Sequence, residues 1–541
     1  MRLGCGSGSV RGCAAAALAI VLSCLSPAPI GLAQSPPPVT PWRGLIDHVS
    51  ASSSGALPQG SADLAAHAIS GDGRYVVMHS MAYDLVPDDW NWETDVFLRD
   101  RQTGATTRLS VGDGGVEANG LSGWAAISTN GRHVVYMSTA TNLVAGDTNG
   151  WWDIFVRDLD AARTVRVSVA TDGTQGDADS YWPAISATGR FVAFVSQATT
   201  FVPGREPYQP RQLYVHDRDT DGNGVFDEPG GSATTLESIS TSGEVANAFV
   251  DYPRITADGR LVLFESQATN LEPATDGTYH LYVRDRQAGT TTLVDTAVTG
   301  GPSAWGVDLR SSDISDDGRF ITFTSYSQDI VWLDMNWVSQ VFLYDAAAAP
   351  ASRFSIVTAL PDGTLANGAS FDTAISQNGQ YVVFRSMATN LAAPAPQPQS
   401  GGVFVRDIAA GTFTRVDVLD TGEPLNHVYP YTPSISADGM TIAFASPATN
   451  VVGEGSWGEL QHVFAVTGFA AEPASASFPM EGGSGSIEVN TSAVSGWNAV
   501  SFDPWITITS GGGFGAGPRT IEYFVDSNGA GIVRDGQIRL S

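Results

Sequence analysis

One short motif recurs seven times along the chain: an isoleucine, a serine or threonine, two variable positions and a glycine. The seven copies begin at Ile69, Ile127, Ile185, Ile255, Ile314, Ile375 and Ile435. Successive copies are 58, 58, 70, 59, 61 and 60 residues apart, and the one long interval contains an insertion at 219–231. A nearly constant period of this length indicates a repeat architecture, in which each repeat is one supersecondary unit.

Each repeat contains four short segments with strand character. In the second repeat these are a strand that ends at Ile127, an apolar strand at 133–137, a third at 153–158 and a fourth at 164–169. A turn with Asn-Gly or Asp-Gly character joins the first two strands, as hairpins prefer. Four antiparallel strands per unit, repeated without helical periodicity, are typical of a β-propeller. We therefore predict an all-β fold with a seven-bladed propeller.

The position of the last strand indicates how the ring closes. A fourth strand follows six of the seven motifs, but after 463–466 the composition changes. The segment 48–50, followed by a Gly-containing turn and Ile69, has the same layout as 108–110 ahead of Ile127. We predict that this N-terminal strand completes the last blade, which closes the ring non-covalently and removes two exposed sheet edges.

The segments 69–77 and 95–100 resemble the WD-like propeller repeats of the TolB type, the exported propellers of bacteria. The resemblance covers residues 44–468, which we assign to the propeller. It implies the fold and, for function, a binding scaffold, a platform in an envelope complex or a regulatory domain of a peptidase. A typical member of that family has six blades, whereas this sequence predicts seven, so the family's partner-binding role is not carried over.

The N-terminus has the pattern of an export signal. An apolar run at 14–25 is followed by Gly-Leu-Ala at 31–33, a small-residue cleavage site. We predict a signal peptide at 1–33, a Pro-rich linker at 34–43 and an exported protein, secreted or periplasmic. Cleavage removes all three cysteines, and with them disulfide and thiol chemistry.

Two further observations bear on the membrane. The segment that ends at Cys24 approximates a lipobox, so anchoring as a lipoprotein at Cys24 is an alternative to secretion. No other apolar stretch approaches 18 residues, so no transmembrane segment is expected.

The composition changes again after Gly468, where Ser- and Gly-rich turns separate short strands. This pattern suggests a small sandwich at 472–541, which resembles a BACON-type immunoglobulin-like domain. That resemblance implies engagement of carbohydrate or mucin. The segment 536–541 resembles the penultimate strand of such a module, so we expect an incomplete sandwich with an open edge, in a chain that is a fragment or a truncated product.

Charge restricts the partners. The chain carries 28 basic residues, all of them arginine, against 56 acidic ones, and its net charge is −28. Nucleic acid and anionic membrane are disfavoured, because their phosphates would not be neutralised. The absence of lysine also excludes Schiff-base and P-loop chemistry.

The insertion contains the most specific local motif, because residues 217–228 match the calcium-loop pattern D-x-D-x-D-G-x5-E at every fixed position. The predicted metal ligands are Asp217, Asp219, Asp221, Asn223 and Glu228. Asp217 also occupies a position that is Asp in other repeats. A second register uses Asp219, Asp221, Asn223 and Asp227 but has Gly230 where the pattern requires Glu. We expect a structural calcium ion to hold the insertion as a hairpin. The alternative is a solvated acidic turn.

Aromatic residues are concentrated in two sets of loops that leave a four-stranded blade on the same face. The loops between the second and third strands carry Trp90, Trp92, Trp151, Trp152, Tyr208, Tyr279, Trp332, Trp337 and Trp457. The loops that enter the first strands add Trp124, Tyr181, Trp182, Tyr252, Trp305, Phe371, Tyr429 and Tyr431, interleaved with Asp177, Asp179, Asp251, Asp308 and Asp372. We predict a ligand-binding face, with Trp92, Trp151, Trp152, Tyr181, Trp182 and Trp337 as the binding residues. The alternative is that these rings pack structurally over the blade junctions.

The sequence offers little support for catalysis. It has no G-x-S-x-G elbow and no H-E-x-x-H motif, and its eight histidines lack ligand spacing. We therefore interpret the chain as a non-enzymatic binding or scaffold protein whose aromatic, acidic face binds a glycan or a protein of the envelope or extracellular space. The alternative is an extracellular propeller hydrolase or lyase that acts on glycan, with carboxylates of the loop face as acid and base.

Overall fold

The structure is a computed structural model of the 541-residue chain. It describes residues 18–24, 46–206, 209–271, 275–332, 336–392, 401–419, 423–426, 431–452, 460–472, 475–491, 496–497, 499–501, 503–513, 515–528 and 534–540. The predicted signal-peptide cleavage site and the linker at 34–43 lie outside these ranges.

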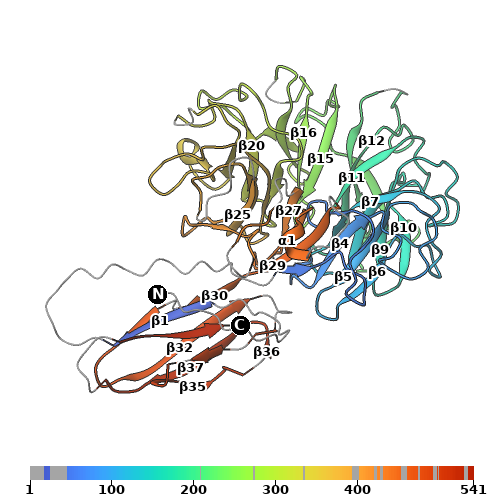
Figure 1. Cartoon of the computed structure of the whole chain (residues 1–541). Coiled ribbons are helices and arrows are strands. Elements are labelled where there is room, and N and C mark those ends of the chain that lie inside the picture. The colour runs from blue at the N-terminus through green and yellow to red at the C-terminus, as the bar shows by residue number, and fades with distance from the viewer. Residues whose placement is uncertain are drawn as a thin grey trace.

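Seven four-stranded antiparallel sheets form the larger unit, arranged as the blades of a β-propeller (Figure 1). Blade 1 contains β3 (Ala62–Asp63), β4 (Tyr75–Ser80), β5 (Asp95–Asp100) and β6 (Ala105–Arg108), and blade 2 contains β7 (Ser122–Ile127), β8 (His133–Ser138), β9 (Asp153–Asp158) and β10 (Arg163–Arg166). Blade 3 contains β11 (Ser180–Ile185), β12 (Phe191–Ser196), β13 (Gln212–Asp217) and β14 (Ala233–Leu236), and blade 4 contains β15 (Val250–Ile255), β16 (Leu261–Ser266), β17 (His280–Asp285) and β18 (Thr290–Leu293).

The remaining blades have the same plan. Blade 5 contains β19 (Ser312–Ile314), β20 (Phe320–Ser325), β21 (Gln340–Asp345) and β22 (Phe354–Ile356), and blade 6 contains β23 (Ser370–Ile375), β24 (Tyr381–Ser386), β25 (Gly402–Asp407) and β26 (Phe413–Arg415). Blade 7 contains β27 (Tyr431–Ile435), β28 (Thr441–Ser446), β29 (His462–Thr467) and, from the other end of the chain, β2 (Ile46–His48). The prediction of seven four-stranded repeats is confirmed.

The recurring motif builds the hairpin between the first two strands of each blade. In blade 2 the Ser128 hydroxyl donates to Asn130 at 2.6 Å and accepts the backbone N–H of His133 at 3.0 Å. Gly131 closes the turn at φ 72°, a left-handed conformation that favours glycine. The motif therefore recurs because each of its polar positions fixes a hydrogen bond of the same turn.

An ion pair ties this hairpin to the third strand in five blades. The pairs are Arg74–Asp100, Arg132–Asp158, Arg190–Asp217, Arg260–Asp285 and Arg319–Asp345. The hydrophobic core lies between blades, because the middle strands are buried on both faces. All six residues of β8, for example, are buried.

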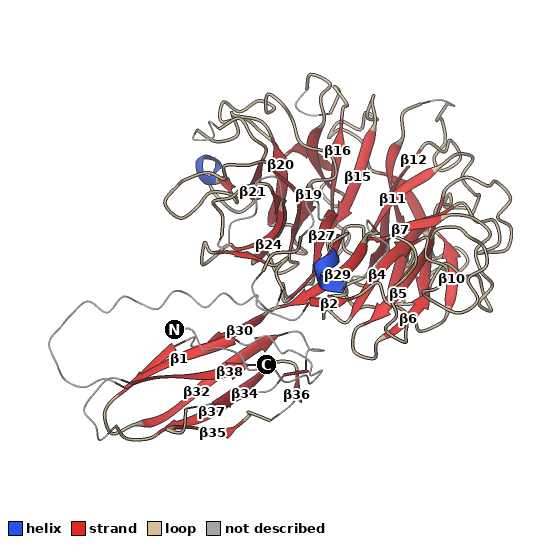
Figure 2. Cartoon of the chain, in the orientation of Figure 1, coloured by secondary structure: helices blue, strands red, loops and turns tan. Residues whose placement is uncertain are grey.

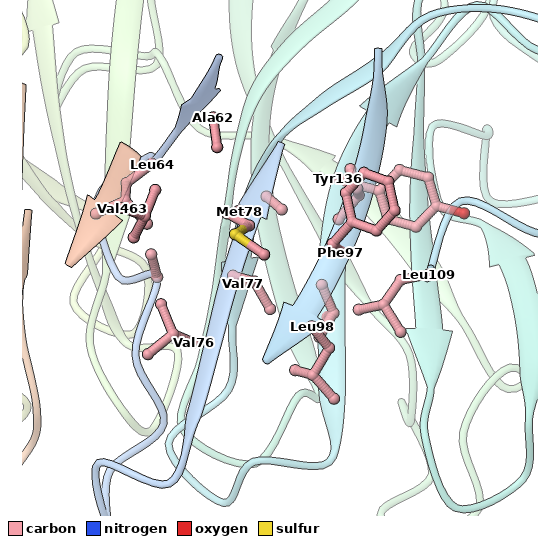
Figure 3. Packing of buried hydrophobic residues seen from close by; sticks show 14 of the residues in the cluster. Ala62, Leu64, Val76, Val77, Met78, Phe97, Leu98, Leu109, Tyr136 and Val463 are labelled. Atoms are coloured by element: carbon pink, nitrogen blue, oxygen red, sulfur yellow. The ribbon is translucent and has the colours of Figure 1, made fainter. Parts of the chain in front are cut away.

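The ring closes as predicted. β2 pairs antiparallel with β29 in the register Ile46↔Val466 to His48↔Phe464. Val49 is buried, and its N–H donates to Val463 at 2.9 Å. Val463 also belongs to the hydrophobic cluster of blade 1 and lies beside Leu64 in Figure 3. The N-terminal strand therefore joins blade 7, and blade 7 packs on blade 1.

The C-terminal strands form a second β unit, drawn beside the propeller in Figure 2. One sheet has the order β30-β32-β37-β35, another β31-β1-β38-β34, and β33 pairs with β36. Their bounds are β1 (Leu18–Cys24), β30 (Phe469–Glu472), β31 (Ser475–Phe478), β32 (Gly483–Thr491), β33 (Gly496–Trp497), β34 (Ala499–Ser501), β35 (Ile506–Ser510), β36 (Gly515–Ala516), β37 (Arg519–Val525) and β38 (Arg534–Leu540). The two four-stranded sheets share one core around Trp497 and Ile521.

β1 comes from the predicted export signal, yet in this structure it pairs with β38 antiparallel and with β31 parallel. β38, which contains the segment that resembles a penultimate strand, is thus paired on both sides, with β1 and β34. Helical structure is limited to η1 (Pro350–Ser352) and α1 (Thr449–Val452) in the part of the chain that the structure describes. Within that part, no helix is long and apolar enough to cross a membrane.

Candidate functional site

The loops between second and third strands, and those from one blade's fourth strand to the next blade's first, leave the propeller on one face. Contacts between the two sets confirm this arrangement: the Trp90 N–H donates to Glu117 at 2.9 Å, and the Ser339 hydroxyl donates to Asp308 at 2.5 Å. We call this surface the aromatic face. Tyr208, Trp457 and Tyr429, which we predicted to lie there, are outside the described residues.

Six tryptophans project from these loops into solvent. The exposed fractions are 72% for Trp90, 72% for Trp92, 47% for Trp151, 65% for Trp305, 80% for Trp332 and 73% for Trp337. They form two groups, one on blades 1 and 2 and the other at blades 4 and 5. Burial in a core does not explain such side chains, and clustered exposed apolar surface usually marks a contact site.

Two of these rings have a strained backbone. Trp92 has φ 60° and Trp337 has φ 57°, in the left-handed region that non-glycine residues seldom adopt. Such strain costs about 1–3 kcal/mol, and it persists where the surrounding structure fixes it. Because the rings are exposed, their own packing cannot supply the compensation.

An asparagine shortly before the ring holds three of these loops in the same way. The side-chain amides of Asn91, Asn149 and Asn336 donate to backbone carbonyls of the adjacent loop, at 3.0, 2.8 and 2.7 Å. The Asn-Trp pairs at 91–92 and 336–337 are a visible sequence signal for this anchor. A prediction based on the aromatic residues alone missed it.

A buried charged cluster also supports the loop that carries Trp90 and Trp92. Asp89, Asp95 and Glu117 bring their carboxylate oxygens within 4.8 Å of one another, which makes them a possible metal group. The guanidinium of Arg108 lies among them, 3.4 Å from Asp89 and 3.7 Å from Asp95. Burial and the neighbouring Asp95 raise the pKa of Asp89 to about 6. An arginine thus already supplies the positive charge that a metal would bring.

The other predicted binding residues are less exposed. Trp152, Tyr181 and Trp182 are partly buried and pack against the cores between blades 2, 3 and 4. Tyr181 and Trp182 also lie in β11 rather than in a loop, and so does Trp124 in β7. Of the six predicted residues, Trp92, Trp151 and Trp337 are therefore the ones that the structure presents to solvent.

The inner strands carry a second set of strained residues around the mouth of the central channel. A register irregularity interrupts the inner strand in blades 2, 3, 4, 6 and 7. Left-handed φ angles occur at His67, Trp124, Trp182, Tyr252, Arg310 and Asp372, one on each of blades 1 to 6. Bulges re-aim side chains and are frequent next to functional sites. The rim of the channel therefore displays aromatic and charged groups.

These rim groups contact one another. Trp182 lies 4.4 Å from Tyr252 between ring centroids, and Arg310 donates to the Tyr252 hydroxyl at 2.9 Å. Arg310 also donates its backbone N–H to Glu265, which is fully buried. Burial raises the pKa of Glu265 to about 8, so this carboxyl is protonated near neutral pH.

Two pairs of side chains cross the channel, and one of them includes the rim residue His67. His67 of blade 1 lies 2.8 Å from Asp313 of blade 5, and Thr129 of blade 2 donates to Gln377 of blade 6 at 2.9 Å. Neither pair joins neighbouring blades, so both span the bore. Burial favours the neutral acid at Asp313, but contact with His67 and Arg254 lowers its pKa. A ligand on the aromatic face therefore meets a floor rather than an open pore.

The carboxylates that we expected to interleave with the rings are mostly engaged in structure. Asp177 accepts hydrogen bonds from Thr199, and Asp179 accepts the N–H of Trp152 and the hydroxyl of Tyr181. Asp251, Asp308 and Asp372 bond to Arg211, Ser339 and Arg385 respectively. The exposed tryptophans therefore support the predicted ligand-binding face more directly than the carboxylates do, because the carboxylates already bond to other residues of the protein.

The predicted calcium loop is held by its own hydrogen bonds. Asp217 makes the bidentate ion pair with Arg190 that recurs in other blades, and Asp227 of the second register makes a bidentate pair with Arg218. Asp219 is buried and accepts the N–H of Asn223 at 3.0 Å. The Asn223 amide donates to Asp221 and Glu228 at 3.0 and 2.7 Å.

The fold and the site define a class: an all-β, seven-bladed propeller that displays exposed tryptophans on one face. No protein-family model matches the chain, and no curated protein matches it.

Some solved structures are similar in shape. An oligogalacturonate lyase in complex with manganese is 11% identical, covering 78% of this chain and 92% of that one, at a TM-score of 0.47. TolB from Acinetobacter baumannii is 13% identical, covering 73% and 80%, at 0.33. A prolyl endopeptidase structure is 12% identical, covering 80% and 55%, at 0.44. These TM-scores lie below 0.5, so the likenesses carry no argument about activity, metal or partner.

Proposed function

We propose that this chain is an exported binding protein that holds glycan on the aromatic face. The observation that carries the proposal is the exposure of Trp90, Trp92, Trp151, Trp305, Trp332 and Trp337 on one face. Indole rings combine a large flat apolar surface with a negative face, which matches the C–H bonds on the flat side of a sugar ring. Export rests on the sequence of 1–33 alone.

The support for the loops favours recognition over catalysis. Asn91 and Asn336 fix the backbone beside Trp92 and Trp337, so the points from which these rings project are set before a ligand arrives. Holding a ring in advance lowers the entropy that binding costs. The two groups of rings lie on different blades with the channel rim between them. That arrangement suits an extended chain of several sugars better than a single small molecule.

The experiment is a screen of the full chain against soluble polysaccharides and peptidoglycan fragments, with retention and product release measured together. Retention without product supports a binding protein. Release of new reducing ends or unsaturated products would replace the proposal by the alternative, a glycan hydrolase or lyase. No retention of any glycan by the wild-type chain would contradict both.

We also propose that the 219–228 segment binds a structural calcium ion in the register of Asp219, Asp221 and Asn223. The Asn223 side chain lies between the carboxylates of Asp221 and Glu228. The Asn223 oxygen accepts the Val225 N–H at 2.7 Å, so its NH2 group occupies the place between the two carboxylates that a cation would take. Oxygen ligands of this kind suit calcium.

A further inference from the structure

The insertion of blade 3 forms one wall of a groove along the outer edge of blade 2, which extends from the hairpin at 130–133 to the loops at 144–145 and 169–173. Two adjoining cavities of about 530 and 660 Å³ lie between this insertion and blade 2, and they share Arg163, Val165 and Asp227. Cavities of this size hold small ligands. The groove follows β10, the outermost strand of blade 2, so the insertion adds a site that the other blades cannot form.

The insertion is a fixed wall. Arg218 is buried and pairs with Asp227 through both nitrogens of its fork, and it donates to the Gly189 carbonyl at 2.7 Å. Phe226 lies against the ring of His133, with the ring centroids 5.4 Å apart. The Arg218 contacts fix the insertion to blade 3 and the Phe226 contact joins it to blade 2, so the groove exists before any ligand enters.

One cation in this groove has no partner. Arg163 is exposed, lines both cavities, and makes no side-chain hydrogen bond, ion pair or ring contact with any residue that the structure describes. By contrast, Arg132 and Arg166 beside it are paired with Asp158 and Asp147. A free guanidinium offers a planar fork that fits a carboxylate through two hydrogen bonds.

The charge of the residues that line the first cavity also favours a carboxylate ligand. Its lining has three arginines, Arg132, Arg163 and Arg218, against Asp158 and Asp227. Burial and the nearby Arg218 lower the pKa of His133 to about 4, so this ring is uncharged at neutral pH. The first cavity is therefore positive within a chain of net charge −28, whereas the second has Asp113, Asp172, Asp227 and Glu228 against Arg163 and Arg166, so we expect the carboxylate in the first cavity. Val165, Val225 and Phe226 provide an apolar wall beside the cations.

Two residues at this groove have a strained backbone. Ala162, directly before Arg163, has φ 50°, whereas glycine occupies the corresponding turn position in other blades, at Gly104, Gly289 and Gly411. Asp227, on the facing wall, has φ 61°. Strained positions of this kind concentrate at binding sites, where the surrounding structure maintains them.

We propose that this groove binds a carboxylate-bearing ligand of sugar or short-peptide size, with Arg163 as the residue that pairs with the carboxylate. The proposal does not depend on the aromatic face, because no tryptophan lines either cavity. A uronic acid and a free peptide terminus share the required chemistry, which is a carboxylate beside an apolar or hydroxylated body.

The test titrates the full chain with glucuronic acid, with N-acetyl-dialanine, and with the amide of that dipeptide, at low salt and constant calcium. We expect one carboxylate probe to bind and the amide to fail. Arg163→Gln should weaken binding about 10-fold or more, the effect of losing a charge-assisted pair. Val225→Glu should also weaken it, because it places a negative charge on the exposed tip of the insertion.

Arg353→Gln is the matched control. Arg353 directly precedes the outer strand of blade 5, where Arg163 begins that of blade 2, and its guanidinium lies over the Tyr344 ring. The control should bind as the wild type does. Wild-type protein that binds neither carboxylate would overturn the proposal, as would equal binding by Arg163→Gln or an equal loss in Arg353→Gln. The probe that binds decides between sugar and peptide.

Discussion

At the scale of single residues, the clearest titrating group is Glu265, a buried carboxyl that accepts the backbone N–H of the rim residue Arg310. Burial raises its folded-state pKa to about 8, above the ordinary value of 4.5. A raised carboxyl pKa stabilises the fold below pH 4.5, and this stability is lost as pH rises towards 8. Glu265→Gln keeps a neutral side chain at every pH, so the variant should melt progressively higher than the wild type between pH 5 and 8, and by a constant margin above that.

The measurement is a series of thermal melts at matched ionic strength. The difference should reach the order of a few kcal/mol at most. Asp308→Asn is a comparison on the same face, where burial likewise raises the pKa of the carboxyl. A difference between Glu265→Gln and wild type that stays flat from pH 5 to 9 would show that the carboxyl is not protonated in the fold.

The calcium proposal is tested at Asp221. Added calcium should raise the melting temperature of the wild type, since a ligand that binds only the folded state stabilises it by mass action. Asp221→Ala should abolish the increment. Asp362→Ala, which removes an exposed turn carboxylate outside the insertion, should retain it. Identical melts in calcium and in chelator would contradict the calcium proposal.

The sequence pattern predicted the right residue types on the aromatic face but could not show which of them are exposed to solvent. Trp92 and Trp152 look alike in sequence, yet Trp92 is exposed and Trp152 packs between blades. Burial depends on the neighbouring blade, which is distant in sequence. The left-handed φ of Trp92 likewise follows from the Asn91 anchor and has no propensity signal. The free guanidinium of Arg163 was also beyond prediction, because pairing depends on tertiary contacts.

At the scale of elements, β2 closes the ring by adding the fourth strand of blade 7. Deleting residues 34–55 removes β2 and the buried Val49, whose burial alone contributes about 1.5–3 kcal/mol. It also leaves β29 with an unpaired edge. We expect a large fall in the melting temperature of the whole propeller, measured by calorimetry or circular dichroism.

Deleting only residues 34–45 is the control, because β2 then remains. This shorter deletion should melt as the parent does. If the longer deletion also melted like the parent, the N-terminal strand would not be a structural part of blade 7.

The elements themselves were largely predictable, because each blade repeats one local hydrogen-bond pattern. The hydroxyl of Ser128 and the glycine at 131 fix the same hairpin that the motif predicts in every repeat. The irregularities of the inner strands were not predictable. They arise where Trp124 and Trp182 meet side chains of the neighbouring blade, His79 and Tyr252. A single repeat does not contain that information.

At the scale of the whole molecule, two parts of the propeller surface differ. The aromatic face carries the exposed tryptophans and the channel rim, and the outer edge of blade 2 carries the groove that the insertion completes. Side chains such as His67 and Asp313 cross the central channel. We therefore expect two independent binding surfaces on one rigid ring.

The central claim is that the exposed rings bind ligand and do not hold the fold. Replacing Trp92, Trp151 and Trp337 together by alanine should leave the melting temperature close to that of the parent, because exposed rings contribute little to a core. Phe524→Ala, an exposed ring of the C-terminal unit, is the control for losing aromatic surface.

The decisive measurement runs a thermal melt of the triple variant beside its binding to the polysaccharide that the wild type retains. We expect a normal melt with binding reduced at least about 10-fold, since aromatic anchors carry much of the affinity of an interface. A loss of several kcal/mol of stability, at the level of about 3–5 kcal/mol expected for each buried aromatic ring, would show that the rings are structural. A normal melt with unchanged binding would show that the aromatic face is not the site.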